Sequence, residues 1–501
     1  MGSTSEFDLH NIQGDIWPGL TKKYQQFFFF NIENPADFKP MLKDLADKVI
    51  TSSHGALVNR AIIHKAKAPP SSGLNVAGAG LNLARDVLTA IHDSLPPHHE
   101  IQKAKGSDHV SITGVNISFT KRGMAKLSKE TFKDDPLLKG MFADMVGEGR
   151  DEAKDWIPEF RDGSVDGVLL VCGTEHEVKE KVNELAQKYL GKKQGIRHLL
   201  TLDGVERSGD AKGHEHFGFL DGISQPLIIG LDDETAEKPG ARKHLTRPGI
   251  IIFGHDGEMD NDPRLMHPPW AKDGSIYVFR KLRQFVPEFD RFLEKEAPRL
   301  KFNKEQLGAR IVGRWKSGAP VQLHPNADCK ADAKFNNFDY PLDDQLNCPF
   351  ASHMRKTKPR GIVENRDKFD IMRRGIPYGP EVGPDEKEKT KLDRGLMFTC
   401  YQTSLSNGFQ FIKNRWVNPD TFPADKTKFT GGMNPGQDPI IGQSVKGAIE
   451  EDDKVMNMSI HDGEGKHNKI TFEPFIQSNG GDYFFTPSLK LLRDLAVAPA
   501  V

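Results

Sequence analysis

An aspartate bracketed by glycines is the first candidate for chemistry in this sequence. Asp221 lies in GHEHFGFLDGISQP (213–226), between Gly218 and Gly222 and among apolar side chains. Glycine lets the backbone take a positive φ or approach a ligand closely, so the pattern predicts a tight turn over an apolar pocket. Burial there would raise the pKa of the carboxyl group and make it a usable acid or base. The alternative is a structural aspartate that caps a helix or bonds to its own turn.

A histidine at the junction of apolar and cationic residues is the second candidate. His353 lies in NCPFASHMRKTKPR (347–360), after Phe-Ala-Ser and before Arg355, Lys356 and Arg360. A lone histidine is usually a satisfied or an exposed one. Its position here suits an axial haem ligand whose basic neighbours reach the haem propionates.

Two consecutive arginines are the third candidate. Arg373 and Arg374 lie in DIMRRGIPYGP (370–380), between apolar residues and a Gly-Ile-Pro turn. We expect at least one guanidinium to point inward, and a surface ion pair is the alternative. In LMFTCYQTS (396–404), period-two alternation places Leu396 and Phe398 on one face of a strand.

The sequence contains no serine nucleophile elbow, no HExxH and no P-loop. An aspartate, an arginine and a histidine without those motifs fit one kind of site in particular. In such a site a carboxylate moves a proton and an arginine stabilises developing charge over a bound metal cofactor.

Composition bounds the class of protein. The chain has 501 residues, a formal charge of −1 and four cysteines without CxxC spacing. The near-neutral charge argues against a nucleic-acid partner, and the cysteines indicate neither a disulfide framework nor a zinc site. No apolar run is long enough to span a membrane. The start, MGSTSEFDLHNIQGD, lacks the regions of a signal peptide, and MGSTSEF is compatible with an expression scar.

The elements that position the candidate residues alternate along the chain. Strand-like segments are 24–32, 109–119, 166–173, 196–206, 249–254, 275–282 and 396–404, and helical spacing is found at 35–52, 121–128, 175–190 and 285–297. This order is compatible with an α+β fold of antiparallel sheet covered by helices, and the second half repeats the rhythm of the first.

Domain organisation is also predicted from these patterns. We place a division near residue 210, which separates residues 1–210 from residues 211–501. The polar segments 319–348 and 377–394 are long, and such insertions are often functional or lid-like. The Gly-rich segment 68–95 lacks the third glycine of GxGxxG, so we do not expect a phosphate site there.

Several residue strings resemble the dye-decolorizing peroxidase family of haem enzymes, in its larger fungal branch. They are NIQGDI near the start, GFLDG, FASHMRKTKPR, IMRRGIPYG, CYQTSLSNGFQFIKNRW, GQDPIIG and GGDYFFTPS. The resemblance spans residues 11 to about 490. It implies two ferredoxin-like halves of the dimeric α+β barrel type, with antiparallel sheets covered by helices and the haem in the C-terminal half.

The resemblance also implies roles for individual residues. Asp221 would be the distal acid/base, and alignment of IMRRGIPYG makes Arg373 rather than Arg374 its partner. His353 would be the iron ligand, and a second-shell carboxylate from Asp438 would accept its hydrogen bond. The remaining cofactor contacts would come from Leu396 and Phe398, which line the distal pocket, and from Arg355, which pairs with a propionate.

The implied activity is that of a peroxidase. With one haem b per chain, it would reduce hydrogen peroxide through Compound I and oxidise anthraquinone dyes, phenols and other aromatic donors one electron at a time. Bulky dyes would deliver electrons through surface residues, of which Trp416 and Tyr378 match the positions. The acidic stretch 380–393 could hold Mn(II) beside Tyr378, although a solvated loop is the commoner role of such a run. The resemblance further implies secretion.

Two alternatives from other classes remain. A non-catalytic haem-binding or haem-handling protein on the same fold would need His353 but not the Asp221–Arg373 pair. A chlorite-dismutase-like enzyme would share the architecture and lack the aspartate of the GxxDG turn. This chain has both His353 and the Asp221–Arg373 pair, so we expect a peroxidase.

Overall fold

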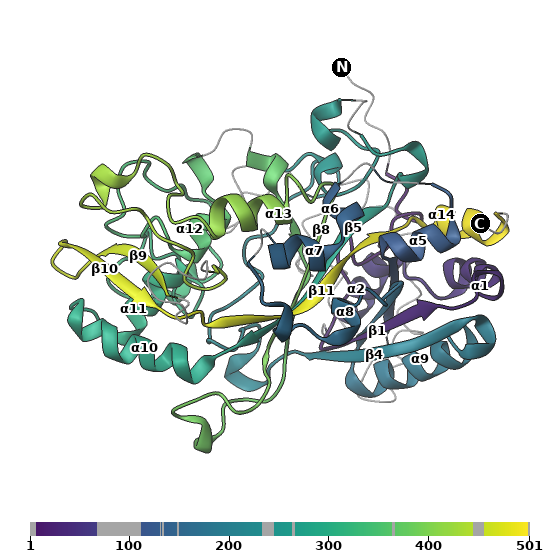
Figure 1. Ribbon diagram of the computed structural model, residues 1–501, viewed down its shortest axis with the longest axis horizontal. Coiled ribbons are helices and arrows are strands. Elements are labelled where there is room, and N and C mark those ends of the chain that lie inside the picture. Colours follow the sequence, from purple (N-terminus) through teal and green to yellow (C-terminus); the bar gives the residue numbers. More distant parts are fainter. Residues whose placement is uncertain are drawn as a thin grey trace.

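One antiparallel sheet runs through the protein and joins its two halves (Figure 1). Its strand order is β4-β1-β3-β2-β11-β5-β8-β6, with β7 paired to β8. The computed structural model describes residues 7–67, 112–130, 132, 135–147, 150–232, 245–262, 266–362, 366–443 and 455–498. The segment 68–95, for which we expect no phosphate site, lies outside these residues.

The strands of the first half have the order and the direction of a ferredoxin-like sheet. They are β1 (Tyr24–Ile32), β2 (Gly114–Phe119), β3 (Gly167–Gly173) and β4 (Ile196–Val205). Their spatial order is 4-1-3-2. The strands of the second half are β5 (Ser275–Gln284), β6 (Met372–Arg373), β7 (Ile376–Tyr378), β8 (Gly395–Gln402) and β11 (Ile476–Thr486).

Numbered within its own half, the second set repeats the first. β11 is the fourth strand, β5 the first, β8 the third and the β6–β7 pair the second, which again gives 4-1-3-2. The halves meet where β2 pairs with β11 and Phe119 lies opposite Phe485. The predicted α+β fold of two ferredoxin-like halves is therefore confirmed.

Helices cover the sheet, and most begin at sequence signals for a helix N-terminus. In the first half they are α1 (Pro35–Lys48), α2 (Ser53–Lys67), α5 (Lys121–Leu127), α6 (Asp135–Lys139), α7 (Met141–Gly147), α8 (Pro158–Arg161) and α9 (Glu175–Lys188). The side chain of Asn34 accepts a hydrogen bond at the start of α1, and a capping box of Thr174 and Glu177 begins α9.

The helices of the second half include those that carry or support the candidate site. They are α10 (Val286–Arg299), α11 (Lys304–Val312), α12 (His353–Thr357), α13 (Phe409–Phe411) and α14 (Leu489–Val497), and a π-helix follows α13 at Ile412–Val417. A separate hairpin is formed by β9 (Met456–His461) and β10 (His467–Phe472). In Figure 1 this hairpin lies with α10, α11 and α12 at the left, and α1, α9, β1 and β4 lie at the right.

One predicted strand is wrong. The segment 249–254 (GIIIFG) is a 3-10 turn at Pro248–Ile250 followed by further turns, although Ile251, Ile252 and Phe253 are fully buried. Pro248 is the first residue of the 3-10 turn, and Gly254, the last residue of the segment, has a φ of +78°. A short apolar run thus reports burial and does not by itself report a strand.

No helix in the described part of the chain is long and apolar enough to cross a bilayer.

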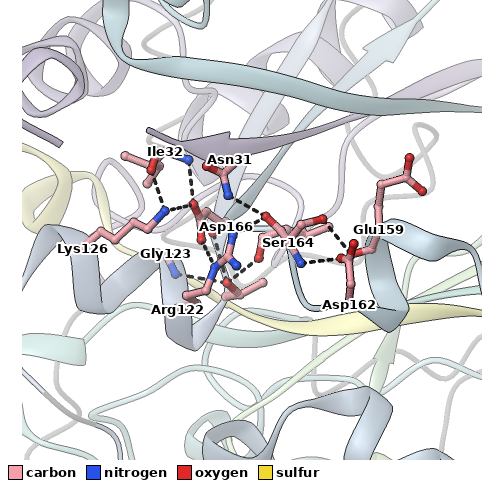
Figure 2. Close-up of polar contacts among 11 residues, drawn as sticks. Asn31, Ile32, Arg122, Gly123, Lys126, Glu159, Asp162, Ser164 and Asp166 are labelled. Carbon is pink, nitrogen blue, oxygen red and sulfur yellow. Dashed lines mark hydrogen bonds and ion pairs between the residues drawn. The ribbon is translucent and has the colours of Figure 1, made fainter. Parts of the chain in front are cut away.

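A buried carboxylate ties α5 to the first sheet. Asp166 is fully buried and accepts hydrogen bonds from Arg122 Nε at 2.6 Å, Lys126 Nζ at 2.6 Å and the main-chain N–H of Ile32 at 2.7 Å. Figure 2 shows Arg122 and Lys126 reaching Asp166 from the same helix, while Ile32 approaches from β1. The carboxylate therefore holds the end of β1, the start of β3 and α5 in register.

We expect Asp166→Asn to lower the free energy of unfolding by about 2–4 kcal/mol. The amide removes the buried negative charge and turns one acceptor into a donor that faces other donors. Asp162→Asn is the matched control, because Asp162 belongs to the same cluster but is exposed; its cost should stay below about 1 kcal/mol. Urea unfolding measures both, and equal losses would contradict the role of Asp166.

Candidate active site

The predicted turn around Asp221 is present. Gly218 and Gly222 have φ values of +95° and +79°, which non-glycine residues rarely adopt. The main-chain N–H of Asp221 donates to the carbonyl of Gly213 at 3.0 Å. The N–H of Gly222 donates to Oδ1 of Asp221 at 2.6 Å. These bonds fix the direction of the carboxylate.

Glu215 supports the same turn and was not anticipated from the sequence. Its two carboxylate oxygens accept the N–H groups of Phe217 at 2.8 Å and Phe219 at 2.9 Å. Gln284 in β5 donates to it at 2.5 Å. Burial raises the pKa of Glu215, and the charge of Asp221 acts in the same direction. An acidic residue inside an otherwise apolar, Gly-rich string was the available signal.

Arg373 meets Asp221, and Arg374 points elsewhere. Nη1 of Arg373 lies 2.8 Å from Oδ1 of Asp221. Arg374 is directed to the carbonyls of Asp15 and Ile16, at 2.9 and 3.1 Å. Because successive residues of a strand face opposite sides, only one of two neighbouring arginines can reach the turn.

Gln225 holds Arg373 in place. Its side-chain amide donates to the carbonyl of Arg373 at 3.0 Å and accepts from its N–H at 3.1 Å. Nη2 of Arg373 also donates to the carbonyl of Ser224 at 3.3 Å. The segment that carries Asp221 thus also positions its arginine partner, a role for Gln225 that periodicity in the sequence does not reveal.

The charge state of Asp221 is set by opposing influences. Desolvation is the largest and acts to raise its pKa, even though 35% of the side-chain surface is accessible. The Arg373 guanidinium and the Gly222 N–H act the other way and leave the pKa of Asp221 below its usual value. The prediction from the sequence that burial raises the pKa of Asp221 is therefore wrong, because it considered desolvation and left out the charge of Arg373.

His353 is the first residue of α12 and is oriented by a buried carboxylate. Its Nδ1 lies 2.9 Å from Oδ2 of Asp438. Oδ1 of Asp438 accepts the N–H groups of Ile440 at 2.8 Å and Ile441 at 3.1 Å. Burial acts to raise the pKa of Asp438, but His353 and these N–H groups hold it below its usual value. An ionised Asp438 requires the ring proton on Nδ1, so Nε2 has a free lone pair.

The side chains at this site fit a haem. An imidazole with a carboxylate on Nδ1 and a free Nε2 is the usual proximal arrangement for a metal-binding histidine. The Asp221 turn and the His353–Asp438 pair adjoin the same buried cluster, which contains Phe219, Ala351 and Ile440. Leu396 and Phe398 in β8 share one face and are half-buried, whereas Met397 between them is buried on the other.

Arg355 is not placed as predicted for a propionate contact. It is fully buried, and its guanidinium donates to the main-chain carbonyls of Pro341, Asp344 and Cys348. The aromatic face of Phe350 lies 4.2 Å from its guanidinium carbon. The side chain thus anchors the segment before α12, and a basic run in the sequence does not distinguish that role from anion binding.

Neither predicted electron-transfer residue lies on the surface. Trp416 is 4% exposed and lies in the π-helix, where it stacks on Phe422 at 5.5 Å between ring centroids. Tyr378 is 5% exposed, and its hydroxyl donates to Oδ1 of Asp393 at 2.9 Å. Burial and the charge of Asp393 raise the pKa of Tyr378. The side chain of Asp393 is 51% exposed, so this pair does reach solvent.

The carboxylates of the acidic stretch 380–393, the predicted Mn(II) ligands, are all engaged in ion pairs. Each of its carboxylates has a cationic partner: Glu381 with Arg207, Asp385 with Lys391, Glu386 with Arg394, Glu388 with Arg291, and Asp393 with Lys281. The only group of metal-binding side chains found among the described residues lies in another loop.

Comparison with known proteins shows which family the chain is similar to. The family profile described as DyP dimeric alpha+beta barrel domain matches residues 11–92 and 86–208, and that of Dyp-type peroxidase, C-terminal, matches residues 258–433. A dye-decolorizing peroxidase of Mycetinis scorodonius is 34% identical, over 98% of this chain and 88% of its own length.

Two solved structures are similar over nearly the whole length. An ancestral D-type dye decolorizing peroxidase gives a TM-score of 0.80 at 38% identity, over 99% of this chain and all of its own. A dye-decolorizing peroxidase with a heme pocket engineered for asymmetric sulfoxidation gives 0.77 at 30% identity, over 98% of this chain and all of its own. With the same strand order in both halves and the Asp221–Arg373 and His353–Asp438 pairs at one site, the chain belongs to the DyP-type peroxidase family, among its fungal members.

Proposed function

We propose that this protein reduces hydrogen peroxide and oxidises anthraquinone dyes, phenols and other aromatic donors one electron at a time. It would use one haem b per chain, held by His353 and contacted by Leu396 and Phe398. The observation that supports this most is the pairing of Asp221 with Arg373 beside the same buried cluster that adjoins His353, whose Nδ1 is fixed by Asp438.

The proton transfer is assigned to Asp221. Its Oδ1 is occupied by Gly222 and Arg373, whereas Oδ2 has no hydrogen-bond partner among the described residues. Oδ2 therefore accepts the proton from one peroxide oxygen and returns it to the other, which leaves as water. When bound, haem supplies the electrons for breaking the O–O bond. Arg373 provides fixed positive charge beside the peroxide while negative charge develops on the leaving oxygen.

Trp416 and Tyr378 would pass electrons from bulky donors to the haem. Oxidised tyrosine must lose its phenolic proton, and Asp393 accepts the hydrogen bond of that hydroxyl. Since both aromatic side chains are buried, a dye would donate from the surface above them rather than in direct contact.

We expect Trp416→Phe to lower turnover of an anthraquinone dye by about tenfold or more, with small phenols nearly unaffected. Phenylalanine keeps a ring against Phe422 but is much harder to oxidise. Tyr378→Phe is the comparison variant, and steady-state rates with both donors separate the two positions. Equal losses on dye and phenol would show a packing defect and would remove Trp416 from the electron path.

The test of the proposed activity is stopped-flow spectroscopy of the haem-loaded protein with one equivalent of peroxide at acidic pH. A Soret band that falls within milliseconds and returns on addition of dye supports the proposal. An unchanged Soret band would favour the haem-handling alternative. Addition of Mn(II) in place of dye tests the predicted Mn(II) oxidation, in which the ion would compete with the cationic partners of the carboxylates in 380–393. Secretion, which the family resemblance implies, is tested by fractionating cells and medium of the native organism.

A further inference from the structure

A histidine, a cysteine and an aspartate converge in the long polar segment 319–348. The imidazole of His324, the thiol of Cys329 and the carboxylate of Asp332 each offer a ligand atom, and these atoms lie within 4.8 Å of one another. Nε2 of His324 is 2.7 Å from Oδ2 of Asp332. Of the four cysteines, Cys329 is the one that is partly exposed.

Local backbone structure brings the three side chains together. Cys329 immediately precedes the 3-10 helix Lys330–Asp332, and the N–H of Asp332 donates to the carbonyl of Cys329 at 2.9 Å. This turn returns the chain beside Cys329, so that the side chains of Cys329 and Asp332 offer their ligand atoms to the same place. His324 is anchored separately, because its carbonyl accepts the indole N–H of Trp315 at 2.8 Å.

We propose that His324, Cys329 and Asp332 bind a zinc ion. A thiolate, an imidazole and a carboxylate are all zinc ligands, and three protein ligands with a water molecule complete a tetrahedral site. The thiolate disfavours Mn(II) and Ca²⁺, which prefer oxygen donors. The proposal is independent of the peroxidase function.

The arrangement needs only small movements to hold the ion. Tetrahedral bonds of about 2.0–2.2 Å from nitrogen and oxygen place those two ligand atoms about 3.3–3.6 Å apart, so Nε2 of His324 and Oδ2 of Asp332, which are 2.7 Å apart, must separate by about 0.6–0.9 Å. Zinc can reach them, because their side chains are 27% and 39% exposed. Within the described residues, the ion-pair partner of Asp332 is His324, and no lysine or arginine neutralises the carboxylate.

The three proposed zinc ligands directly precede residues 333–336, which pack against the turn that carries Asp221. Gly318 fits tightly between the carbonyl of Ala333 and the side chains of Leu220 and Ile223, since a Cβ there would lie 2.3–3.0 Å from them. The Asn336 amide donates to Ser224 at 3.4 Å. Zinc would thus fix the loop that supports this turn, and its binding should raise the Tm of the folded protein.

Calorimetric titration with ZnCl2 tests the site, on haem-loaded protein whose cysteines are kept as free thiols. We expect one zinc per chain and weaker binding of MnCl2. Cys329→Ser should lower zinc affinity by more than about 100-fold, because loss of an outer-shell partner alone costs 10–100-fold. Asp332→Asn should also weaken binding, whereas Asp328→Asn, the same charge change in the same loop, should not. Absence of zinc binding, or equal affinity in the wild type and Cys329→Ser, would overturn the proposal.

A measurement on the wild type avoids any folding defect of the variants. Iodoacetamide should alkylate Cys329 in the zinc-free protein, and ZnCl2 should slow this reaction at least about tenfold, because a zinc-bound thiolate is a weaker nucleophile. Peptide mass spectrometry identifies the modified cysteine, and MnCl2 serves as the control ion. Alkylation at the same rate with and without zinc would exclude Cys329 as a ligand.

Discussion

Asp221→Asn is expected to slow the reaction with hydrogen peroxide by about 10²–10⁴-fold, the usual contribution of a positioned general acid–base group. The amide has the shape of the carboxylate and keeps an oxygen for the N–H of Gly222 and for Arg373. What it lacks is a basic Oδ2, so no side chain takes the peroxide proton. The second-order rate constant of the Soret change in stopped-flow measures the effect.

The pH dependence separates the base from its arginine partner. Asp221 acts while ionised, and its pKa lies below the usual value, so the rate should persist in acid and fall only as the pH drops through that lowered pKa. Arg373→Leu removes the positive charge and leaves desolvation unopposed, so the pKa of Asp221 rises and activity is lost at a higher pH. Arg373→Lys keeps the charge, so its rate should persist to a lower pH than the rate of Arg373→Leu. The same fall of the rate with decreasing pH in wild type and Arg373→Leu would contradict this electrostatic role.

The local features of the site were predictable from the sequence because each depends on a short stretch. Two glycines around Asp221 require a turn, and the adjacent Arg373 and Arg374 must face opposite ways in a strand. The same holds for Leu396 and Phe398, which alternate with a buried neighbour. The likeness of residue strings, rather than periodicity, supplied the pairing of His353 with Asp438 across 85 positions.

Features that depend on tertiary packing were not predictable in this way. Arg355 follows the histidine in a basic run, yet three carbonyls from the preceding loop take up its donors. Trp416 follows the polar run 413–415, but its ring lies in the π-helix against Phe369, Phe411 and Phe422. The cluster of His324, Cys329 and Asp332 has no established motif spacing, and only the 3-10 turn brings its ligand atoms together.

Asp438→Asn should weaken haem retention by about 10–100-fold, although it changes only one atom. Oδ1 of Asp438 accepts two main-chain N–H groups, so the oxygen of the introduced amide must stay there and its NH2 group must face His353. That NH2 group donates to Nδ1, which forces the ring proton onto Nε2. Nε2 then has no lone pair for iron, the same tautomer inversion that disables a catalytic histidine when its aspartate becomes asparagine.

Transfer of haem from the variant to excess apomyoglobin measures this effect as a rate of loss. Asp420→Asn is the matched control, because it removes the same charge from a neighbouring loop, where the carboxylate of Asp420 accepts a hydrogen bond from the side chain of Asn434 at 2.9 Å. It should retain haem like the wild type. Since Asp438 is fully buried, the variant's urea midpoint must be compared as well. Fast haem loss with an unchanged midpoint assigns the effect to the tautomer of His353, whereas normal retention would show that Asp438 does not set it.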